Sequence, residues 1–527
     1  MSRLFACALP ALLWGSACAL PALVPCAAGG RGGRQGLCTT GAGAGAAAAA
    51  ATPIALRGAN YIRLGGNTVG PNTRYHTTFD VGVYNRTRYQ LAFRAMAADG
   101  YNVNRVFLDE RPGSGIGGPA NATAPLDGAW LDRLAQFIAD AEACGIYTIV
   151  TTVYCPNNAF FRNVSDQLPP LPPAWQQAGW NAFLTANHQA AWAAYTAELA
   201  AALAARLPPA AQAATLVSLQ NEFFLNGNEY PFGERNGTVA DGFADGGSYD
   251  MAVAADRQQA ADANTNRWAG LCRDAIRAHL PATLVTVGVF TFQAVHKAGP
   301  NGLLLDGCEA GAPPPKGVDC RFPARPLWLS RAGLDFLDVH IYQPDGSPAA
   351  LAANLATEEW GAIANATPIV MGEFGCNAEW GLNATTCAPR VRQLQISSCD
   401  QGFVGWLFWT YDTAEQPDPH WFTVMEAGGA INGVLAPARN PDPCSNSSSA
   451  AAAKSECQKL CEGKRQDGCC QYDDAGGCLW IDGGWVIGGG AEPGRSAANC
   501  HASGTCEVWN DDEGCHYTAA DEGPMRR

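Results

Sequence analysis

The amino-acid sequence predicts a (β/α)8 barrel followed by a small disulfide-rich C-terminal module. From residue 53 to about residue 421, short apolar and β-branched runs alternate with longer stretches of helical period, and eight such units can be counted. Polar residues gather where these runs end, which is where a barrel places its functional groups. A doubly wound parallel sheet would fit the alternation as well, so the position of the polar residues favours the barrel.

The expected strands are near-continuous apolar runs, as parallel strands covered on both faces should be. They span residues 54–62, 103–108, 146–153, 215–219, 284–289, 336–341, 369–371 and 403–408. The intervening stretches show helical spacing, for example in the series Tyr89, Ala92, Phe93 and Met96. A second apolar stripe covers residues 130–141 with Asp127 as its expected N-cap, and further helices are expected over 188–207 and 250–280.

The N-terminus resembles an export signal, which we expect to span residues 1–28. Arg3 precedes an apolar stretch that runs to about residue 24, and small residues suited to cleavage occur at 17–19 and again at 27–28. A membrane anchor is the alternative, but prolines interrupt the stretch and no stop-transfer flank follows it. We therefore expect a cleaved signal and no membrane insertion of the mature chain.

Composition divides the rest of the chain into four parts. A Gly/Ala-rich spacer is expected over 29–52, the barrel over 53–433, a Pro/Asn/Ser/Ala-rich linker over 434–456 and a Cys-rich module over 457–527. The module is too short to rely on a hydrophobic core. Nine cysteines lie from Cys444 onward, so one of them is expected to pair with the barrel or to stay free. The tryptophans of the module are either its core or a carbohydrate-binding surface.

Charge and cysteine content predict a secreted protein that has no nucleic-acid partner. The formal net charge is −14, and the absence of a dense basic run argues against nucleic-acid or anionic-membrane partners. Of 21 cysteines, three lie in the signal region and the remaining 18 form an even number, which suits disulfides. Sequons for N-glycosylation occur at Asn85, Asn121, Asn163, Asn236, Asn365, Asn383 and Asn446. Together these features predict a secreted protein, which we expect to be a monomer.

The ends of the expected strands carry polar residues that a plain core would not hold. They are Arg105 on strand two, Asn221 and Glu222 after strand four, His340 and Tyr342 at strand six, Glu373 at strand seven, and Trp409 after strand eight. Two glutamates on strands four and seven suit hydrolysis of an acetal, because one protonates the leaving oxygen while the other attacks the anomeric carbon. A guanidinium beside Glu373 is expected to lower the pKa of that carboxyl. His340 could instead be a hydrogen-bonded core residue.

These motifs resemble glycoside hydrolase family 5, a cellulase-like family whose hallmark is Asn-Glu at strand four and Glu at strand seven. The resemblance covers roughly residues 53–421. It implies that Glu222 is the acid/base and Glu373 the nucleophile of a retaining enzyme, and that Asn221 binds the sugar 2-hydroxyl. It implies further that Arg105 and Tyr342 hold the nucleophile, that His340 lines the cleft, and that Trp409 forms its floor. Many members carry a His after strand three, where this chain has the segment 151–154 with sequence Thr-Thr-Val-Tyr.

The expected activity is hydrolysis of a β-linked polysaccharide, a β-glucan or a mannan. A transglycosylase would use the same residues, and a non-catalytic glycan-binding or wall protein would keep the barrel without the activity. No His-x-x-x-His or Cys-x-x-Cys pair occurs in the barrel and no phosphate-binding loop is found, so neither a metal nor a cofactor is expected. Six loop aromatics either line a polysaccharide cleft or simply pack the loops. They are Trp175, Trp180, Phe223, Phe224, Tyr230 and Phe232.

Overall fold

The structure, a computed structural model, describes most of the expected barrel. It covers residues 20–27, 34–40, 51–65, 74–297, 308, 316–356, 360–414 and 420–444, together with the backbone of three short strands between 468 and 516. No helix within these ranges is both long enough and apolar enough to cross a membrane.

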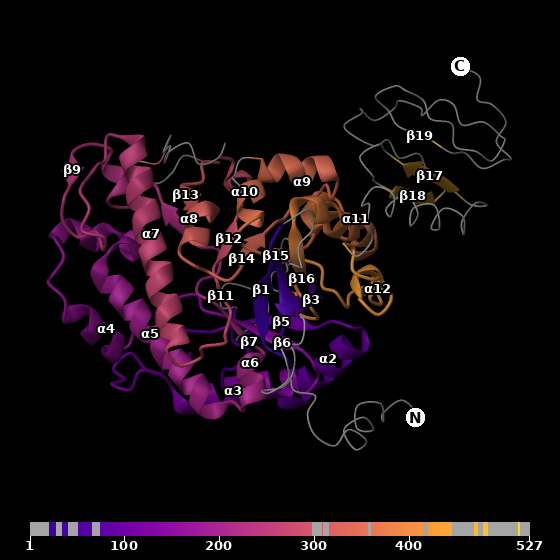
Figure 1. Cartoon of the computed structure of the whole chain (residues 1–527), viewed down its shortest axis with the longest axis horizontal. Helices are drawn as coiled ribbons and strands as arrows, with labels where there is room; N and C mark the ends of the chain where they lie inside the picture. Colours follow the sequence, from indigo (N-terminus) through magenta and orange to yellow (C-terminus); the bar gives the residue numbers. More distant parts are fainter. Residues whose placement is uncertain are drawn as a thin grey trace.

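A nearly closed parallel sheet forms the centre of the molecule (Figure 1). Its strands are β4 (Leu56–Asn60), β5 (Val103–Phe107), β6 (Tyr147–Thr151), β7 (Thr215–Ser218), β11 (Val285–Thr286), β12 (Gly288–Phe290), β14 (Leu337–His340), β15 (Ile369–Phe374) and β16 (Phe403–Phe408). Their order in the sheet is β11-β7-β6-β5-β4-β16-β15-β14-β12. The predicted (β/α)8 barrel is therefore confirmed.

The fifth expected strand differs from the prediction because it is interrupted at Val287. Its first half, β11, pairs with β7, whereas its second half, β12, pairs with β14. The amide of Gly288 meanwhile donates to the carbonyl of Gln220 (2.9 Å). One expected strand thus contacts both neighbours in succession and closes the barrel.

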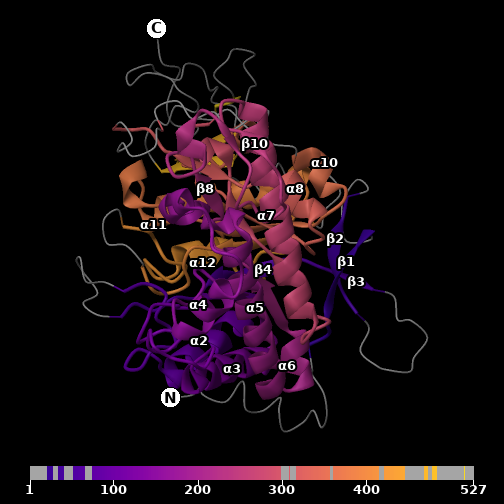
Figure 2. The same ribbon diagram turned by 90° about the vertical axis from the view of Figure 1, so that its left-hand side faces the viewer.

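Helices surround the sheet, and α5 and α7 lie side by side along one flank (Figures 1 and 2). The longer helices are α2 (Arg86–Ala98), α3 (Gly128–Glu142), α5 (Ala186–Arg206), α7 (Ala254–Arg277) and α11 (Ala384–Ser397). The shorter ones are α4 (Ala159–Asp166), α6 (Pro209–Ala213), α8 (Pro326–Arg331), α9 (Pro348–Leu355), α10 (Trp360–Ala364) and α12 (Ala430–Leu435). As predicted, Asp127 caps α3 by accepting from Trp130 N (2.7 Å), and the apolar stripes of α2 and α3 are buried.

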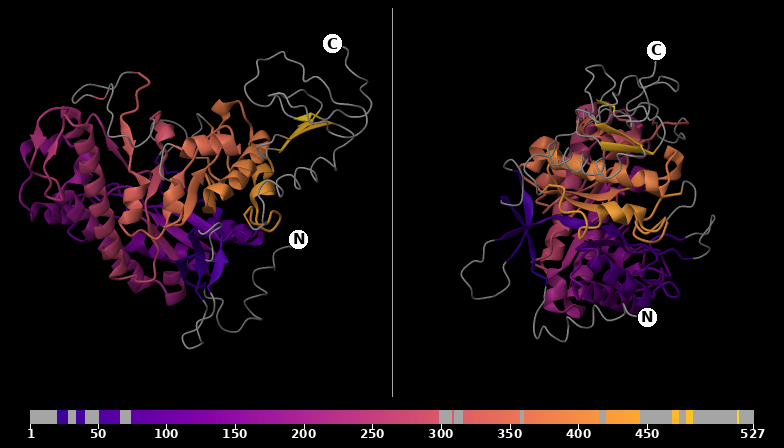
Figure 3. Two further views of the ribbon diagram at one scale, coloured as in Figure 1. Left: turned by 45° about the horizontal axis from the view of Figure 1, so that its top comes forward. Right: turned by 90° about the vertical axis from the view of Figure 1, so that its right-hand side faces the viewer.

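An antiparallel sheet near the N-terminus packs against the end of the barrel where its strands begin, and it is seen at the right of Figure 2 and at the left of the right-hand view in Figure 3. It comprises β1 (Leu23–Cys26), β2 (Gly36–Thr39) and β3 (Thr52–Ile54), and a disulfide joins Cys26 to Cys38. Leu23 and Leu37 are buried in one cluster with side chains from the bottom of the barrel. Parts of both the expected signal and the expected spacer therefore belong to the folded barrel domain.

The barrel domain also extends beyond the expected boundary at residue 433. A disulfide joins Cys399 to Cys444, so the odd cysteine of the tail pairs with the barrel. The buried Arg57 side chain donates to the carbonyls of Leu435 (2.6 Å) and Asn440 (2.6 Å). Because these contacts satisfy a buried guanidinium, the segment up to Cys444 is part of the fold rather than a linker.

In the C-terminal region, three strands form a separate antiparallel sheet. They are β17 (Gly468–Tyr472), β18 (Cys478–Asp482) and β19 (Cys515–His516). The rest of the expected Cys-rich module, including its disulfide pairing, lies outside the described residues.

Candidate active site

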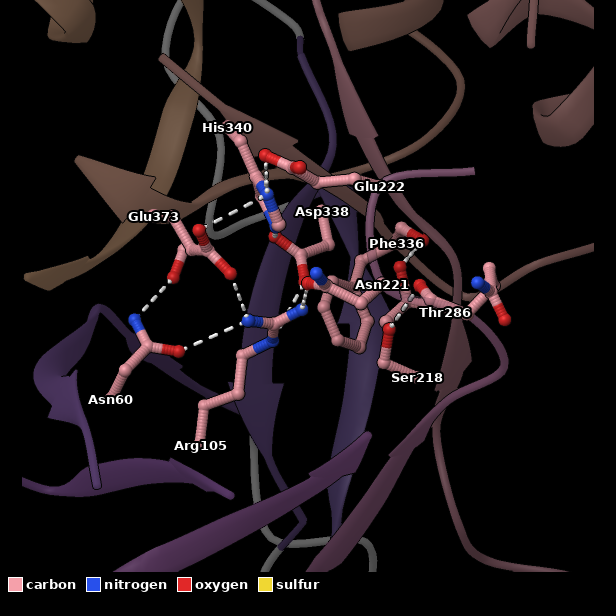
Figure 4. A network of polar contacts seen from close by, with 12 residues as sticks. Asn60, Arg105, Ser218, Asn221, Glu222, Thr286, Phe336, Asp338, His340 and Glu373 are labelled. Atoms are coloured by element: carbon pink, nitrogen blue, oxygen red, sulfur yellow. Dashed lines mark hydrogen bonds and ion pairs between the residues drawn. The ribbon is translucent and has the colours of Figure 1, made fainter. Parts of the chain in front are cut away.

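The residues predicted from the strand ends come together at one end of the barrel (Figure 4). Arg105 lies in β5, Glu222 follows β7, His340 ends β14 and Glu373 lies within β15. Strand β15 runs to Phe374, three residues past its expected end, so that Glu373 is held by the sheet itself rather than by a loop. A carboxylate on a strand is more rigidly placed than one on a loop.

Arg105 is the centre of this cluster and is fully buried. Its Nη1 donates to Glu373 Oε1 (2.5 Å) and to Asn60 Oδ1 (3.0 Å), and its Nη2 donates to Asn221 Oδ1 (2.8 Å). Its Nε lies 3.3 Å from Asp338 Oδ2. The guanidinium therefore fixes two carboxylates and two amides from four different strand ends (Figure 4).

Glu373 is almost completely buried and receives a second hydrogen bond from Tyr342. The Tyr342 hydroxyl donates to Oε2 (2.7 Å) while Arg105 holds Oε1. Burial raises the pKa of Glu373 and the charge of Glu222 adds to this rise, whereas His340 and Arg105 oppose it. Arg105 lowers this pKa as expected, but burial outweighs its effect, so the net direction in the free site is upward and the expected net lowering is wrong. The sequence could not reveal how completely the carboxyl is desolvated.

Glu222 occupies an unusual backbone position for a residue with a side chain. Its φ is 48°, in the left-handed region, which costs about 1–2 kcal/mol for a non-glycine residue. The backbone is pinned on both sides, because Asn221 N donates to the carbonyl of Thr152 (3.1 Å) and Phe223 N to that of Gly288 (2.8 Å). The carboxylate is 31% exposed, so it faces the open side of the site.

His340 faces three carboxylates at once. Its Nδ1 lies 3.0 Å from Glu222 Oε1 and 3.4 Å from Glu373 Oε2, and its Nε2 lies 3.5 Å from Asp338 Oδ1. Burial would lower the pKa of this imidazolium, but the charges of Glu373 and Asp338 outweigh burial and raise the pKa to about 10. The hydrogen bond and charge of His340 in turn overcome burial and lower the pKa of Glu222. The arrangement therefore favours a charged imidazolium at His340 beside an ionised Glu222.

The two glutamates are close together. One carboxylate oxygen of Glu222 and one of Glu373 lie within 4.8 Å of each other, and His340 lies within the same distance of both. Retaining glycosidases hold their carboxyls about 5–5.5 Å apart, whereas inverting enzymes need ~6.5–9.5 Å. Such spacing would also suit a metal ion, but Arg105 and the protonated His340 already place two positive charges among these carboxylates, which disfavours a cation.

Trp409, which was expected to form the floor of the cleft, is only 6% exposed. It belongs to a small apolar cluster that includes Phe107, with the Tyr342 ring packed against the cluster. Its ring meets the ring of Phe107 edge-on, with centroids 5.5 Å apart. Trp421 in turn packs against Tyr342. An aromatic surface thus borders Glu373.

Two site residues, Asn60 and Asp338, were not assigned from the sequence. Asn60 ends β4, where it accepts from Arg105 and donates to the carbonyl of Gly372 (2.9 Å). Asp338 is 1% exposed, and a Cβ on Gly372 would lie 1.6 Å from its Oδ1. The available signal was a polar residue in an apolar strand: Asn60 ends β4, whereas Asp338 is the second residue of β14.

The loop aromatics divide into two groups. Trp175, Phe223 and Phe232 are buried, which agrees with the interpretation that these aromatics simply pack the loops. Trp180, Phe224 and Tyr230 are half-buried. Trp180 and Phe224 stack on each other with ring centroids 5.1 Å apart, whereas Tyr230 meets Trp175 edge-on.

Comparison with known proteins gives a family match. The model of the cellulase family, glycosyl hydrolase family 5, matches residues 62–415. No curated protein sequence matches the chain.

Solved structures with related folds include three mannan-cleaving enzymes. An exo-β-1,4-mannosidase from an Opitutaceae bacterium is 16% identical with a TM-score of 0.40, and the match covers 74% of this chain but only 58% of that one. An endo-β-1,4-mannanase from Thermotoga petrophila is 15% identical over 73% of this chain and 77% of its own, with a TM-score of 0.43. An endo-1,4-β-mannanase from Rhizomucor miehei is 13% identical over 74% and 94%, with a TM-score of 0.44.

Proposed function

The chain belongs to glycoside hydrolase family 5, and from that membership we propose that it hydrolyses a β-linked polysaccharide, a glucan or a mannan, with retention of configuration. Glu222 is the acid/base and Glu373 the nucleophile. The observation that carries the proposal is the spacing of the two carboxylates, within 4.8 Å, combined with the two hydrogen bonds that orient Glu373.

In the first step, a carboxylate oxygen of Glu373 attacks the anomeric carbon and the bond to the leaving oxygen breaks. The electron pair of that bond goes to the oxygen, which takes a proton from Glu222 and departs as an alcohol. In the second step, Glu222 removes a proton from water, and the resulting hydroxide displaces Glu373 from the sugar. Arg105 and Tyr342 hold the nucleophile in place through both steps.

His340 supplies the proton that Glu222 needs. In the free site the proton sits on His340, 3.0 Å from Glu222 Oε1. A bound sugar excludes water and disfavours separated charges, so the proton moves across this hydrogen bond and leaves Glu222 as the neutral acid. The two residues therefore act as one acid with a shared proton.

We further propose that the protein is secreted. Four disulfides among the described residues support an oxidising compartment. The N-terminal apolar stretch and the seven sequons support the same proposal.

The proposal is tested by measuring reducing-sugar release from soluble β-1,3-, β-1,4- and mixed-linkage glucans and from mannans. Wild type is compared with Glu373→Gln, which keeps the shape of the side chain but removes the nucleophile. Release from one polymer by wild type alone identifies the substrate, and NMR of the first product shows the retained anomer. Binding without release by both proteins would refute hydrolysis in favour of a non-catalytic glycan-binding protein. Transfer to added oligosaccharide in place of release would identify a transglycosylase.

A further inference from the structure

A two-stranded ribbon begins directly beside Glu222. Strand β8 (Phe224–Asn226) starts two residues after it and pairs antiparallel with β13 (Arg321–Pro323). The disulfide between Cys308 and Cys320 closes the segment that leads into β13. The first strand of the ribbon therefore lies next to the acid/base residue along the chain, and the disulfide constrains the segment before the second strand.

The ribbon carries an aromatic surface that solvent can reach. Phe224 stacks on Trp180 with an interplanar angle of 16°, and Trp180 Nε1 donates to the Phe224 carbonyl (2.7 Å). Tyr154 meets Trp180 edge-on at 5.7 Å and is 53% exposed. Apolar aromatic surface of this kind packs well against the C–H faces of pyranose rings.

Arg321 adds a polar group to the same surface. Its guanidinium carbon lies 5.0 Å from the ring centroid of Phe290 and 5.7 Å from that of Phe224, and Asp319 holds it in an ion pair (2.7 Å). The side chain is 41% exposed, so it can still bind a ligand. Its positive charge also helps to lower the pKa of Glu222.

We propose that Tyr154, Trp180, Phe224 and Arg321 form the subsite for the sugar of the leaving group. The inference rests on the proposed function, because it takes Glu222 as the acid. Glu373 and Tyr342 mark the sugar that is attacked, whereas the acid must reach the oxygen that joins this sugar to the next one. Surface that adjoins Glu222 through its own chain therefore meets the departing sugar. The ligand is a neutral β-linked pyranose, stacked on the rings and hydrogen-bonded through its hydroxyls to Arg321.

The test compares two substrates that share a glycone. An oligosaccharide fills the leaving-group subsite, whereas a β-glycosyl fluoride has a leaving group too small to use it. We expect Trp180→Ala to lower kcat/KM for the oligosaccharide about tenfold and to leave the fluoride unchanged. Trp328→Ala, on the outer helix α8, is the matched control: it also removes a half-buried tryptophan that lies beside an arginine.

Each outcome of this comparison decides the proposal. An equal loss on both substrates, or no loss on either, would overturn the subsite. The control variant shows whether a loss comes merely from removing a half-buried ring. If wild type cleaved neither substrate, the proposed hydrolase function would fail instead, so the two failures are distinguishable.

The chain around Leu20 is held against the end of α3. The backbone nitrogen of Leu20 lies 3.1 Å from Glu142 Oε1, and the Tyr147 hydroxyl donates to the carbonyl of Pro21 (2.7 Å). Glu142 is the last residue of α3, where a negative charge is unfavourable because helix carbonyls point toward it. A cation beside this carboxylate would offset that repulsion.

The folded N-terminal sheet limits where the chain can be cut. Cleavage after residue 28, one of the two sites that the sequence allows, would remove β1 and the disulfide partner of Cys38. It would also uncover Leu37, which is fully buried at the bottom of the barrel. Cleavage within residues 17–19 or directly after them leaves all of these contacts intact.

We infer that a signal peptidase hydrolyses the Ala19–Leu20 bond, which follows the small residues Ala17 and Ala19. Water adds across the amide, so Ala19 gains a carboxylate and Leu20 gains an α-ammonium. The new ammonium lies at the position of the Leu20 nitrogen and pairs with Glu142. The cut therefore creates an ion pair between the start of the mature chain and the end of α3.

The inference is tested on protein collected from the culture medium. N-terminal sequencing is expected to begin at Leu20, and a start at Gly29 or upstream of Leu20 would overturn the inference. Glu142→Gln is expected to lower Tm more at pH 6 than at pH 9.5, because the α-ammonium loses its charge near pH ~8. Asp132→Asn, which removes an exposed ion pair on the same helix, is the control and should show no such difference. Equal losses at both pH values would refute the pairing with Glu142.

Discussion

Replacing Asp338 with asparagine removes one charge from the site while preserving the shape of the side chain. Asp338 Oδ1 lies 3.5 Å from His340 Nε2, and Oδ2 lies 3.3 Å from Arg105 Nε. The carboxylate is one of the two main charges that raise the pKa of His340 to about 10. We expect Asp338→Asn to move the alkaline limb of kcat/KM toward lower pH.

The size of this effect follows from the distance. Two unit charges 3.5 Å apart interact by about 5 kcal/mol at an effective dielectric constant of ~20. At 1.36 kcal/mol per pH unit this corresponds to a displacement of about 3.5 pH units at most. The direction of the pH shift follows from the protonation state that is active. The pair of His340 and Glu222 must hold one proton, and that proton is lost at lower pH once Asp338 no longer stabilises the imidazolium.

The assay is the pH dependence of kcat/KM, with circular dichroism at each pH to confirm that the protein remains folded. Gly372→Ala is a second route to the same change, because the added Cβ would lie 1.6 Å from Asp338 Oδ1 and would displace the carboxylate. The control is Asp335→Asn, which breaks an ion pair with Arg277 (2.5 Å) just before the same strand. An alkaline limb that stays in place in both site variants would refute the role assigned to Asp338.

Four further predictions address the chemistry and the stability. Glu222→Ala should lower oligosaccharide hydrolysis by about 10²–10⁴-fold, and added azide should restore turnover as a β-glycosyl azide; an α-azide would contradict the mechanism. A 2-deoxy-2-fluoroglycosyl fluoride should label Glu373, and mass spectrometry of the peptides would reveal a label elsewhere. Phe137→Ala should cost about 3–5 kcal/mol in urea unfolding, because this buried ring meets four other aromatic rings. Replacing both Cys399 and Cys444 with serine opens a 45-residue loop and should cost ~4 kcal/mol, while an unchanged Tm would argue against that disulfide.

Features that depend on local spacing or on the fold class were predictable from the sequence. The capping of α3 by Asp127 needs only residues within one helical turn. The meeting of Arg105 and Glu373, 268 residues apart, could be predicted because a barrel brings all its strand ends to one face. The identity of the strands was therefore enough to anticipate which polar side chains converge.

Features that depend on particular long-range contacts were not predictable. The interruption of strand five arises because Gly288 must pair with the backbone beside Glu222, and no local pattern encodes that. The segment 20–40 resembles a leader and a spacer in composition, yet Leu23 and Leu37 complete the apolar base of the barrel. The pKa of Glu373 depends on how much water is excluded around it, which is a property of the whole site.

The left-handed backbone at Glu222 has a consequence for how such a barrel can change over time. A glycine there would relieve about 1–2 kcal/mol of strain, so an inactive Glu222→Gly protein should be no less stable than the wild type. A lineage that used the barrel only to hold glycan would gain stability by losing this glutamate.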